Sequence, residues 1–378
     1  MRFTPFDLVQ WQSRYEPTVD YTLADSSCRP VELRDFLDET QVARLVAGAQ
    51  HYPEVRGTPE LRRLVAGWQG CRPEEVVVTV GAAEANSILA GALIGPGDHV
   101  VLMEPGYRQV WGLAHNAGAK ISVVGLDERN GWRLDVAALE SAVRPDTRVI
   151  AVTNPNNPAG SVLTAQEMAA VVAVAERNGT WLMVDEVHRG TELDTDEVTT
   201  TFWGHYDRLV CVGSLSKAFA LPGLRVGWIV ATGDLLDELC RRHEYATVST
   251  GLLAMRIAEA ALTTPYRDRL LDRNRRLMRE GRQLLLRWAE AHPDLVSIVA
   301  PTATALGLLR YRAEATSLEV AHALRRRGGV LVAPGAHFGA DGHLRVIHSL
   351  EPGYVSAALD RVASVLTEGV ETGDPPTR

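Results

Sequence analysis

The chain has 378 residues, 46% hydrophobic and 23% charged, with a formal net charge of -8 at pH 7. This length predicts more than one hydrophobic core, and the acidic balance argues against a general binder of nucleic acid. Four scattered cysteines and the lack of a long apolar run or hydrophobic leader predict a cytoplasmic protein with reduced thiols, no membrane association and no metal site.

The middle of the chain alternates short apolar runs with helical patterns, which predicts a mainly parallel sheet covered by helices. The runs are almost continuously hydrophobic, as strands buried on both faces are. A helix of small residues is expected from Ala82. Seven strands are expected, at residues 75–80, 99–103, 120–124, 148–152, 181–185, 208–213 and 225–230.

From about residue 265 the pattern changes to one long amphipathic helix and then to a smaller α+β unit. The helix carries eight arginines between residues 267 and 287, interpreted as a solvated face. Strands are expected at "GLLRYR", "VLVAP" and "HLRVIHS", and helices at "SLEVAHALRRRG" and "EPGYVSAALDRVASVLTEG". The expected division is an N-terminal arm with part of the small domain (1–45), a large domain (46–264), a connector helix with the small domain (265–370), and a disordered tail (371–378).

One lysine, Lys217 in "GSLSKAFALPGLRVGW", follows the strand expected at 208–213. Ligands of open parallel sheets bind outside the carboxyl ends of strands. A lysine with its ordinary pKa of about 10.4 is a poor nucleophile at neutral pH, so a catalytic one needs help from its surroundings or a carbonyl partner. Taken alone, Lys217 would be interpreted as a surface residue in a loop.

Further motifs surround this lysine: "VGAAEAN", "EPGYRQV", "NPNNPAG", "WLMVDEVHRG" and "HYPEVRG". With them the chain resembles the fold-type I pyridoxal phosphate enzymes, specifically the class I and II aminotransferases. The resemblance implies an aspartate-aminotransferase-like α/β fold, pyridoxal 5′-phosphate as cofactor, and 46–264 as the domain that binds it. In that family the lysine of the S-x-S-K motif, here Lys217, forms the Schiff base and later moves the proton.

The resemblance also implies a phosphate site. Arg225, a planar and permanently charged donor, suits a phosphate, and the hydroxyls of Ser214 and Ser216 add donors. The backbone amides of Ala82 and Ala83 join them, since a helix N-terminus holds an anion without side chains.

The remaining motifs surround the ring and the substrate. Asp185, at the end of an apolar strand, would keep the ring nitrogen protonated, because a buried carboxylate needs a charged partner. By resemblance Asn157 binds the ring hydroxyl oxygen and contributes to the substrate site, Tyr107 stacks on the ring, and Arg345 clamps the substrate carboxylate. The simpler explanations are that Asp185 caps a turn, that Tyr107 packs in a core and that Arg345 lies on the surface.

Two positions extend or break the family pattern. Tyr52 matches the tyrosine that reaches the phosphate of the neighbouring subunit, which implies a homodimer with shared active sites. His188 stands where the family usually has tyrosine. A neutral imidazole would keep the tyrosine's donor role, whereas an imidazolium would add charge and alter the chemistry.

The expected activity is amino transfer from an amino acid or a derived intermediate. "DEVHRG" and the N-terminal "YEPTVDYTLADSSCRPVELRDFL" resemble a natural-product branch that contains capreomycidine synthase. On that branch the alternatives are β-elimination, cyclisation or decarboxylative oxidative deamination. A regulator of the same fold would carry a DNA-binding domain, and a dinucleotide enzyme would have GxGxxG in place of "GAAEAN".

Overall fold

The computed structural model describes residues 3–370 and contains one large sheet, one four-stranded sheet and one two-stranded sheet. The large sheet has the order β2-β9-β8-β7-β6-β3-β4-β5, and its strands from β8 to β4 all run parallel. β9 is antiparallel to both of its neighbours. The strands are β2 (Val76–Thr79), β3 (His99–Glu104), β4 (Lys120–Asp127), β5 (Arg133–Leu134), β6 (Thr147–Thr153), β7 (Trp181–Asp185), β8 (Leu209–Ser214) and β9 (Gly227–Val230).

The seven strands expected in the large sheet are all present, and the mainly parallel α/β architecture is confirmed. The structure adds the two-residue strand β5, which extends the edge by pairing antiparallel with β4. Alternate residues of one strand enter two different cores: Val76 and Val78 lie in one, and Val77 lies in the other. Burial on both faces explains why these strands are hydrophobic throughout.

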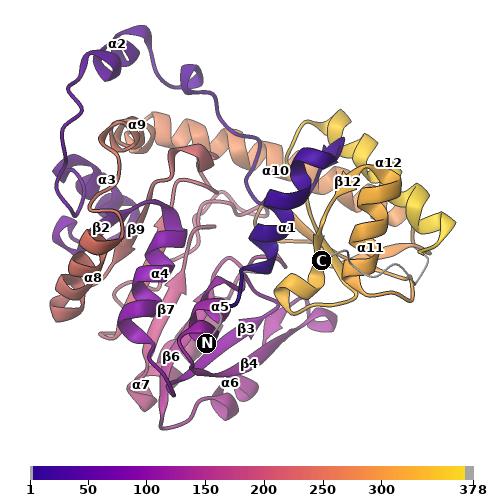
Figure 1. Cartoon of the computed structure of the whole chain (residues 1–378), viewed down its shortest axis with the longest axis horizontal. Helices are drawn as coiled ribbons and strands as arrows, with labels where there is room; N and C mark the ends of the chain where they lie inside the picture. Colours follow the sequence, from indigo (N-terminus) through magenta and orange to yellow (C-terminus); the bar gives the residue numbers. More distant parts are fainter. Residues whose placement is uncertain (1–2, 371–378) are drawn as a thin grey trace.

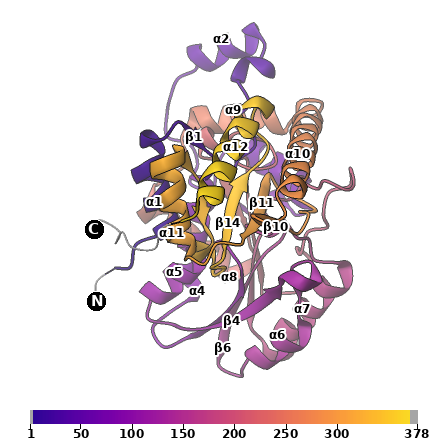
Figure 2. The same ribbon diagram turned by 90° about the vertical axis from the view of Figure 1, so that its right-hand side faces the viewer.

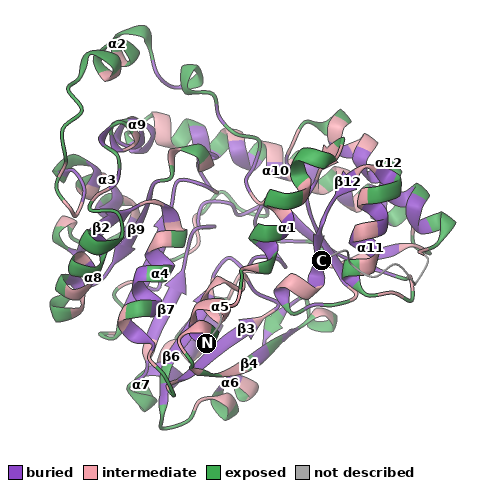
Figure 3. Cartoon of the chain, viewed as in Figure 1, coloured by how far each residue is buried: buried purple, intermediate pink, exposed green. Residues whose placement is uncertain are grey.

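Helices cover both faces of the large sheet (Figures 1 and 3), and the buried strands lie between their exposed outer sides. One face carries α4 (Gly81–Leu93), α5 (Gln109–Asn116) and α8 (Gly233–Ala246). The other core draws on α3 (Pro59–Gln69), α6 (Val136–Ala142), α7 (Ala165–Asn178) and α9 (Leu252–Leu262).

The four-stranded sheet has the order β10-β11-β14-β13 and is formed by the C-terminal part of the chain, drawn in orange and yellow in Figure 2. Its strands are β10 (Val296–Ile298), β11 (Leu306–Tyr311), β13 (Ala333–Pro334) and β14 (His343–Ile347). Around it lie α10 (Tyr266–Ala291), α11 (Ser317–Ala323) and α12 (Pro352–Glu368). The short β10 is not recognisable in the sequence pattern.

The N-terminal segment belongs spatially to this second sheet. β1 (Tyr21–Thr22) pairs with β12 (Val330–Leu331) in the two-stranded sheet, so "VLVAP" forms two short strands, β12 and β13, instead of the single one predicted. The preceding helix α1 (Asp7–Tyr15) is held by a hydrogen bond from Trp11 Nε1 to the carbonyl of Val332 at 2.8 Å. The segment from α1 to β1 therefore packs against the C-terminal part of the chain.

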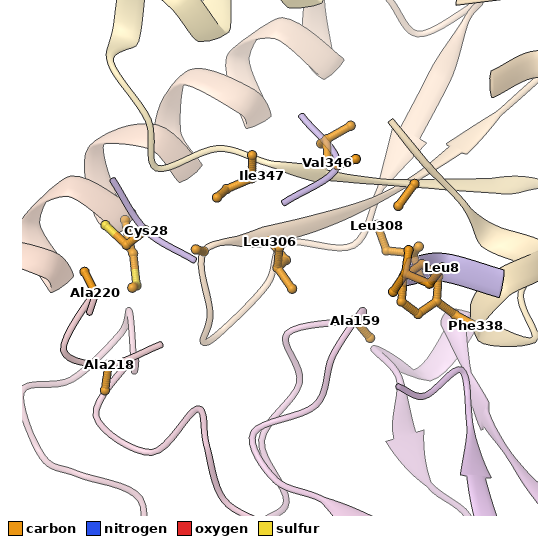
Figure 4. Packing of buried hydrophobic residues seen from close by; sticks show 14 of the residues in the cluster. Leu8, Cys28, Ala159, Ala218, Ala220, Leu306, Leu308, Phe338, Val346 and Ile347 are labelled. Atoms are coloured by element: carbon orange, nitrogen blue, oxygen red, sulfur yellow. The ribbon is translucent and has the colours of Figure 1, made fainter. Parts of the chain in front are cut away.

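A single hydrophobic core runs between the two larger sheets. The residues labelled in Figure 4 come from the N-terminal segment, from the four-stranded sheet and from loops of the large sheet, and all belong to this cluster. They are Leu8, Cys28, Ala159, Ala218, Ala220, Leu306, Leu308, Phe338, Val346 and Ile347.

The long helix α10 is bound to the large sheet more firmly than expected. Arg275 forms a buried ion pair with Glu192 at 2.8 Å. Arg279 and Arg282 pair with Asp196 and Asp194 at 2.7 and 2.6 Å, so these three arginines are not merely a solvated face. The prediction was wrong for them because their acidic partners lie about eighty residues earlier in the chain.

The helix α2 (Glu39–Ala47) stands away from the body of the chain (Figure 1) and has no buried residue. Within residues 3–370 no helix combines the length and hydrophobicity needed to cross a membrane. The tail predicted to be disordered, 371–378, lies outside the described residues.

Candidate active site

A cavity of about 240 Å³ opens where β7 and β8 end and α4 begins. All the site residues expected from the sequence line this cavity except Tyr52 and Arg345. A larger groove of about 570 Å³, between α7 and residues 192–205, has neither lysine nor arginine in its lining. The lining of the smaller cavity is Asp25, Ser26, Ser27, Ala82, Ala83, Asn86, Tyr107, Gln109, Thr153, Asn157, Asp185, Val187, His188, Ser214, Ser216, Lys217, Pro222 and Arg225.

Lys217 lines the cavity, three residues after β8 ends. Its Nζ donates hydrogen bonds to Ser26 Oγ at 2.7 Å and to Ser27 Oγ at 3.2 Å. Burial lowers the pKa of Lys217 to about 8, assisted by the positive charge of Arg345 and opposed by Asp25. A much larger fraction of this amine is therefore neutral and nucleophilic at pH 7 than of an ordinary lysine.

Asp185 closes one end of the cavity at the last position of β7, with 8% of its surface exposed. Its Oδ1 accepts a hydrogen bond from the amide of Val187 at 3.1 Å, and its Oδ2 accepts one from Asn86 Nδ2 at 3.3 Å. Burial raises the pKa of Asp185, so the ionised carboxylate is costly here without a cation. A protonated ring nitrogen would supply that charge.

Another group of lining residues is suited to hold an anion. No side chain caps the N-terminus of α4, so its first-turn amides, including those of Ala82 and Ala83, point toward the cavity without a capping partner. Arg225 has a left-handed backbone with φ of 53° and lies directly over this turn. A Cβ on Gly81 would lie 2.4 Å from its guanidinium, and one on Gly227 would lie 2.6 Å from the Ala82 nitrogen. Only glycine permits this approach.

Arg345, on β14, is fully buried and lies behind the cavity lining. Its Nη1 donates to Asn157 Oδ1 at 3.1 Å, its Nη2 donates to the Ala24 carbonyl, and its Nε has no partner in residues 3–370. Burial lowers the pKa of Arg345 to about 10, which leaves it charged at neutral pH. The structure thus brings Arg345 to the site through Asn157.

Tyr107 follows β3 and lines the cavity beside Asp185. Its ring meets that of Phe6 edge to face, with 5.2 Å between centroids. Burial raises the pKa of Tyr107 to about 12, with a further contribution from Asp185, so the phenol is neutral. A flat aromatic ring over the centre of the cavity suits a planar ligand.

His188 lines the cavity with 1% of its surface exposed, and neither ring nitrogen has a hydrogen-bond partner among the described residues. Burial, together with the charges of Lys217 and Arg345, lowers the pKa of His188 well below its ordinary value. The geometry therefore favours the neutral imidazole of the two interpretations drawn from the sequence.

Several site residues were missed in the sequence. Asp25, Ser26 and Ser27 come from the N-terminal segment, and no local pattern connects them with Lys217, about 190 residues away. Asn86 could have been found, because it lies one turn after Ala82 on the same helix.

Two residues of α10 support the site from behind. Asn274 Nδ2 donates to the carbonyl of Ala218, next to Lys217, at 2.8 Å. Arg275 Nε donates to the carbonyl of Gly190, two residues after His188, at 3.0 Å. The helix therefore fixes the two loops that present Lys217 and His188.

Tyr52 is not brought to the cavity of its own chain. It lies beyond α2 with 87% of its surface exposed, one of the most exposed large hydrophobic residues described. The other expected site residues form a consistent set. The lining combines an anion cradle, a buried carboxylate and an amine of lowered pKa, which fit the phosphate, ring nitrogen and aldehyde of pyridoxal phosphate.

Comparison with known proteins gives a consistent result. The family model "Aminotransferase class I and II" matches residues 27–362. The chain is 33% identical to capreomycidine synthase of Streptomyces vinaceus over 296 residues, which cover 77% of this chain and 74% of that protein. It is 29% identical to the arginine–pyruvate transaminase of Pseudomonas aeruginosa over 318 residues, 82% of this chain and 80% of that one.

Solved structures share the fold over nearly the whole chain. A PLP-dependent aminotransferase from Streptococcus suis superposes with a TM-score of 0.91 at 28% identity, covering 99% of this chain and 100% of that one. Aspartate aminotransferase from Thermus thermophilus superposes with a TM-score of 0.85 at 23% identity, covering 96% and 97%, and shows the same fold.

Proposed function

The chain belongs to the class I and II aminotransferases, enzymes that depend on pyridoxal 5′-phosphate, and from this premise we propose that its described cavity transfers the amino group of an amino acid to a keto acid. When bound, the cofactor supplies an aldehyde that captures amines and a ring that accepts electrons as a bond to the substrate Cα breaks. The site residues bind, orient and move protons around that chemistry.

The cofactor end of the site holds three groups in place. Arg225, Ser214, Ser216 and the amides of Ala82 and Ala83 bind the phosphate. Asp185 holds a proton on the ring nitrogen, and in return its buried carboxylate gains the charged partner it otherwise lacks.

The reacting end depends on the amine of Lys217 and on two orienting groups. Lys217 would hold the cofactor through its aldehyde, and its amine would carry the proton to and from the substrate Cα. Tyr107 packs against the ring, and Asn157 and the neutral His188 donate to its hydroxyl oxygen. Arg345 binds the substrate carboxylate with a bidentate fork, for which its Nε is free.

A homodimer with shared sites is part of the proposal. The support is the exposure of Tyr52 together with Val46 and Tyr245, which are 87%, 81% and 95% exposed in the isolated chain. The dimer would place Tyr52 of one protomer at the phosphate of its partner. To test this, Tyr52→Phe protein is mixed with Lys217→Ala protein so that heterodimers form. If the sites are shared, one of the two sites in each heterodimer contains both wild-type residues. Restored cofactor affinity in that site is expected only in this case.

We further place the enzyme in the cytoplasm. All four cysteines are free, and Cys28 and Cys211 are buried. Unpaired thiols are usual in a reducing compartment.

The observation that carries the proposal is that Lys217, an anion cradle and a buried carboxylate line one cavity. The chain contains only one other lysine, Lys120, which lies exposed on β4. Borohydride reduction of the cofactor-loaded protein, followed by peptide mapping, should therefore label Lys217 and leave Lys120 unmodified. Label on Lys120 alone would overturn the assignment.

A second candidate reaction is favoured by the 33% identity to capreomycidine synthase and by His188 at the usual tyrosine position. On this alternative the same residues carry β-elimination, cyclisation or decarboxylative oxidative deamination of a modified amino acid, the last with an external oxidant. Spectra recorded with an amino donor and no keto acid separate the two. Stoichiometric conversion to the amine form of the cofactor supports transfer, and catalytic release of ammonia supports the alternative.

A further inference from the structure

The charged groups of the site can be assigned one by one, and one carboxylate is left over. On the proposed function, Arg225 meets the phosphate, Asp185 the ring nitrogen, Lys217 the aldehyde and Arg345 the substrate carboxylate. Asp25 also lines the cavity, where its negative charge opposes the lowering of the pKa of both Lys217 and Arg345, and no group of the cofactor is assigned to it.

Asp25 lies between the two cations of the reacting end. The carbonyl of Ala24 accepts from Arg345 Nη2, and Ser26 Oγ accepts from Lys217 Nζ at 2.7 Å. Asp25 therefore sits next to the place where the substrate Cα must lie. Its Oδ1 accepts from the amide of Ser26. Among residues 3–370 the carboxylate forms no ion pair at salt-bridge distance, and Lys217 and Arg345 act on it only through their nearby charges.

The surroundings of Asp25 add negative charge. Partial burial and the repulsion of Asp25 raise the pKa of Glu16, which follows α1. On the neighbouring wall of the site Arg108 is already paired with Glu104 at 2.6 Å. In the described lining of the cavity, no second cation remains to receive a side-chain carboxylate of a dicarboxylic substrate.

Two buried polar side chains of the site have ring or guanidinium nitrogens without a hydrogen-bond partner. Both nitrogens of the buried His188 and the Nε of the buried Arg345 have no partner in the described structure. Buried polar groups are normally hydrogen-bonded. On the proposed function the ring hydroxyl oxygen satisfies His188 and the substrate carboxylate satisfies Arg345, so the substrate side chain is the group left to face Asp25.

We propose that Asp25 selects amino donors whose side chain carries a cation, a guanidinium or an ammonium group, as its partner. This inference rests on the proposed function, because it assigns the substrate class of the same site. A charge-assisted hydrogen bond in a partly enclosed pocket favours the cationic donor over an isosteric neutral one. A donor with an acidic side chain would meet Asp25 as a like charge and is excluded.

The test is the rate of cofactor conversion in single-turnover absorbance measurements with arginine, norleucine and glutamate as probes. The wild type should prefer arginine over norleucine in kcat/KM by at least tenfold, and glutamate should be the poorest. In Asp25→Asn the arginine-to-norleucine ratio should fall about tenfold or more, whereas Asp25→Glu should keep most of it.

Asp20→Asn is the matched control, because it removes a carboxylate from the same segment that instead pairs with Arg361 at 2.7 Å. The control should leave the ratio within about twofold of wild type. Since the ratio is measured within one preparation, a loss of folded Asp25→Asn protein does not affect it.

Two failures can be told apart. If wild-type protein converts the cofactor with these donors but shows no preference for arginine, or if Asp25→Asn slows all donors equally, the role of Asp25 is overturned and amino transfer stands. If none of a broad panel of amino acids converts the cofactor, the proposed function fails, and the inference fails with it.

Discussion

The two ends of the active site are built in different ways. At the cofactor end, Asp185, Ser214 and the first turn of α4 all lie at strand or helix ends of one sheet, within about 130 residues of one another. At the substrate end, Asp25 and Arg345 come from segments more than three hundred residues apart in the sequence. The first end follows from local motifs, whereas the second exists only after the N-terminal segment has docked on the four-stranded sheet.

This contrast has a functional meaning. Substitutions at the cofactor end should weaken the reaction of every amino donor in the same proportion, because they act on the group that all donors share. Substitutions at the substrate end should change affinity or preference. The following expectations, from the largest effect to the smallest, test that separation.

Lys217→Ala should have the largest effect. We expect loss of the absorbance of the covalently held cofactor and at least a hundredfold loss of turnover with every donor, since both the attachment and the proton carrier are removed. Absorbance spectra and steady-state rates measure this. Lys120→Ala should retain both properties, and a Lys217→Ala protein that retained them would refute the assignment.

Asp185→Asn should lower turnover about a hundredfold, because a shift of two units in the ring nitrogen's pKa corresponds to about 2.7 kcal/mol. The measurement is the single-turnover rate per bound cofactor. Glu186→Gln is the control: Glu186 faces away from the cavity and binds the Phe202 amide at 2.7 Å and Thr201. An equal loss in both variants would mean that the effect is structural.

Arg345→Lys should raise KM about thirtyfold for all amino donors, because an ammonium cannot reproduce the bidentate fork. We expect kcat at saturation to change much less. Unlike Asp25→Asn, this variant should leave the ratio between arginine and norleucine near that of the wild type. A changed ratio would show that the two substrate-end residues cannot be separated.

The smallest effect concerns pH. With the pKa of Lys217 lowered to about 8, its amine is mainly protonated below that pH and mainly neutral above it. The rate at which cofactor-free protein captures the aldehyde should therefore rise about tenfold between pH 7 and pH 9 and then level off. Stopped-flow absorbance reports it, and a rate that still climbs in proportion to hydroxide up to pH 10 would indicate an unperturbed lysine.

The sequence predicted the parts of the molecule that depend on local patterns. The strands that precede Asp185 and Lys217 are buried on both faces, and their hydrophobic runs are recognisable one by one. The turn at Gly81, where a strand ends and a helix begins, is also recognisable in the sequence, and it is the turn that Arg225 contacts.

The remaining features depend on contacts between distant segments. Nothing near Asp25 indicates that it will meet Lys217, and nothing near Arg275 indicates a buried partner in Glu192. The segment "VLVAP" divides between two sheets because β1 pairs with its first half. Tyr52 remains a prediction, since its partner would belong to another copy of the chain.

The bonds of α10 have a mechanical consequence. Between Asn274 and Arg282 this helix is tied to the loops after β7 and β8, so its part up to Arg282 should move as one body with the large sheet. Any rotation of the four-stranded sheet over a bound substrate would then pivot beyond Arg282, inside the helix, and not at its start near residue 265. Because α10 is held to the large sheet as far as Arg282, such a rotation would move Arg345 and leave Lys217 in place.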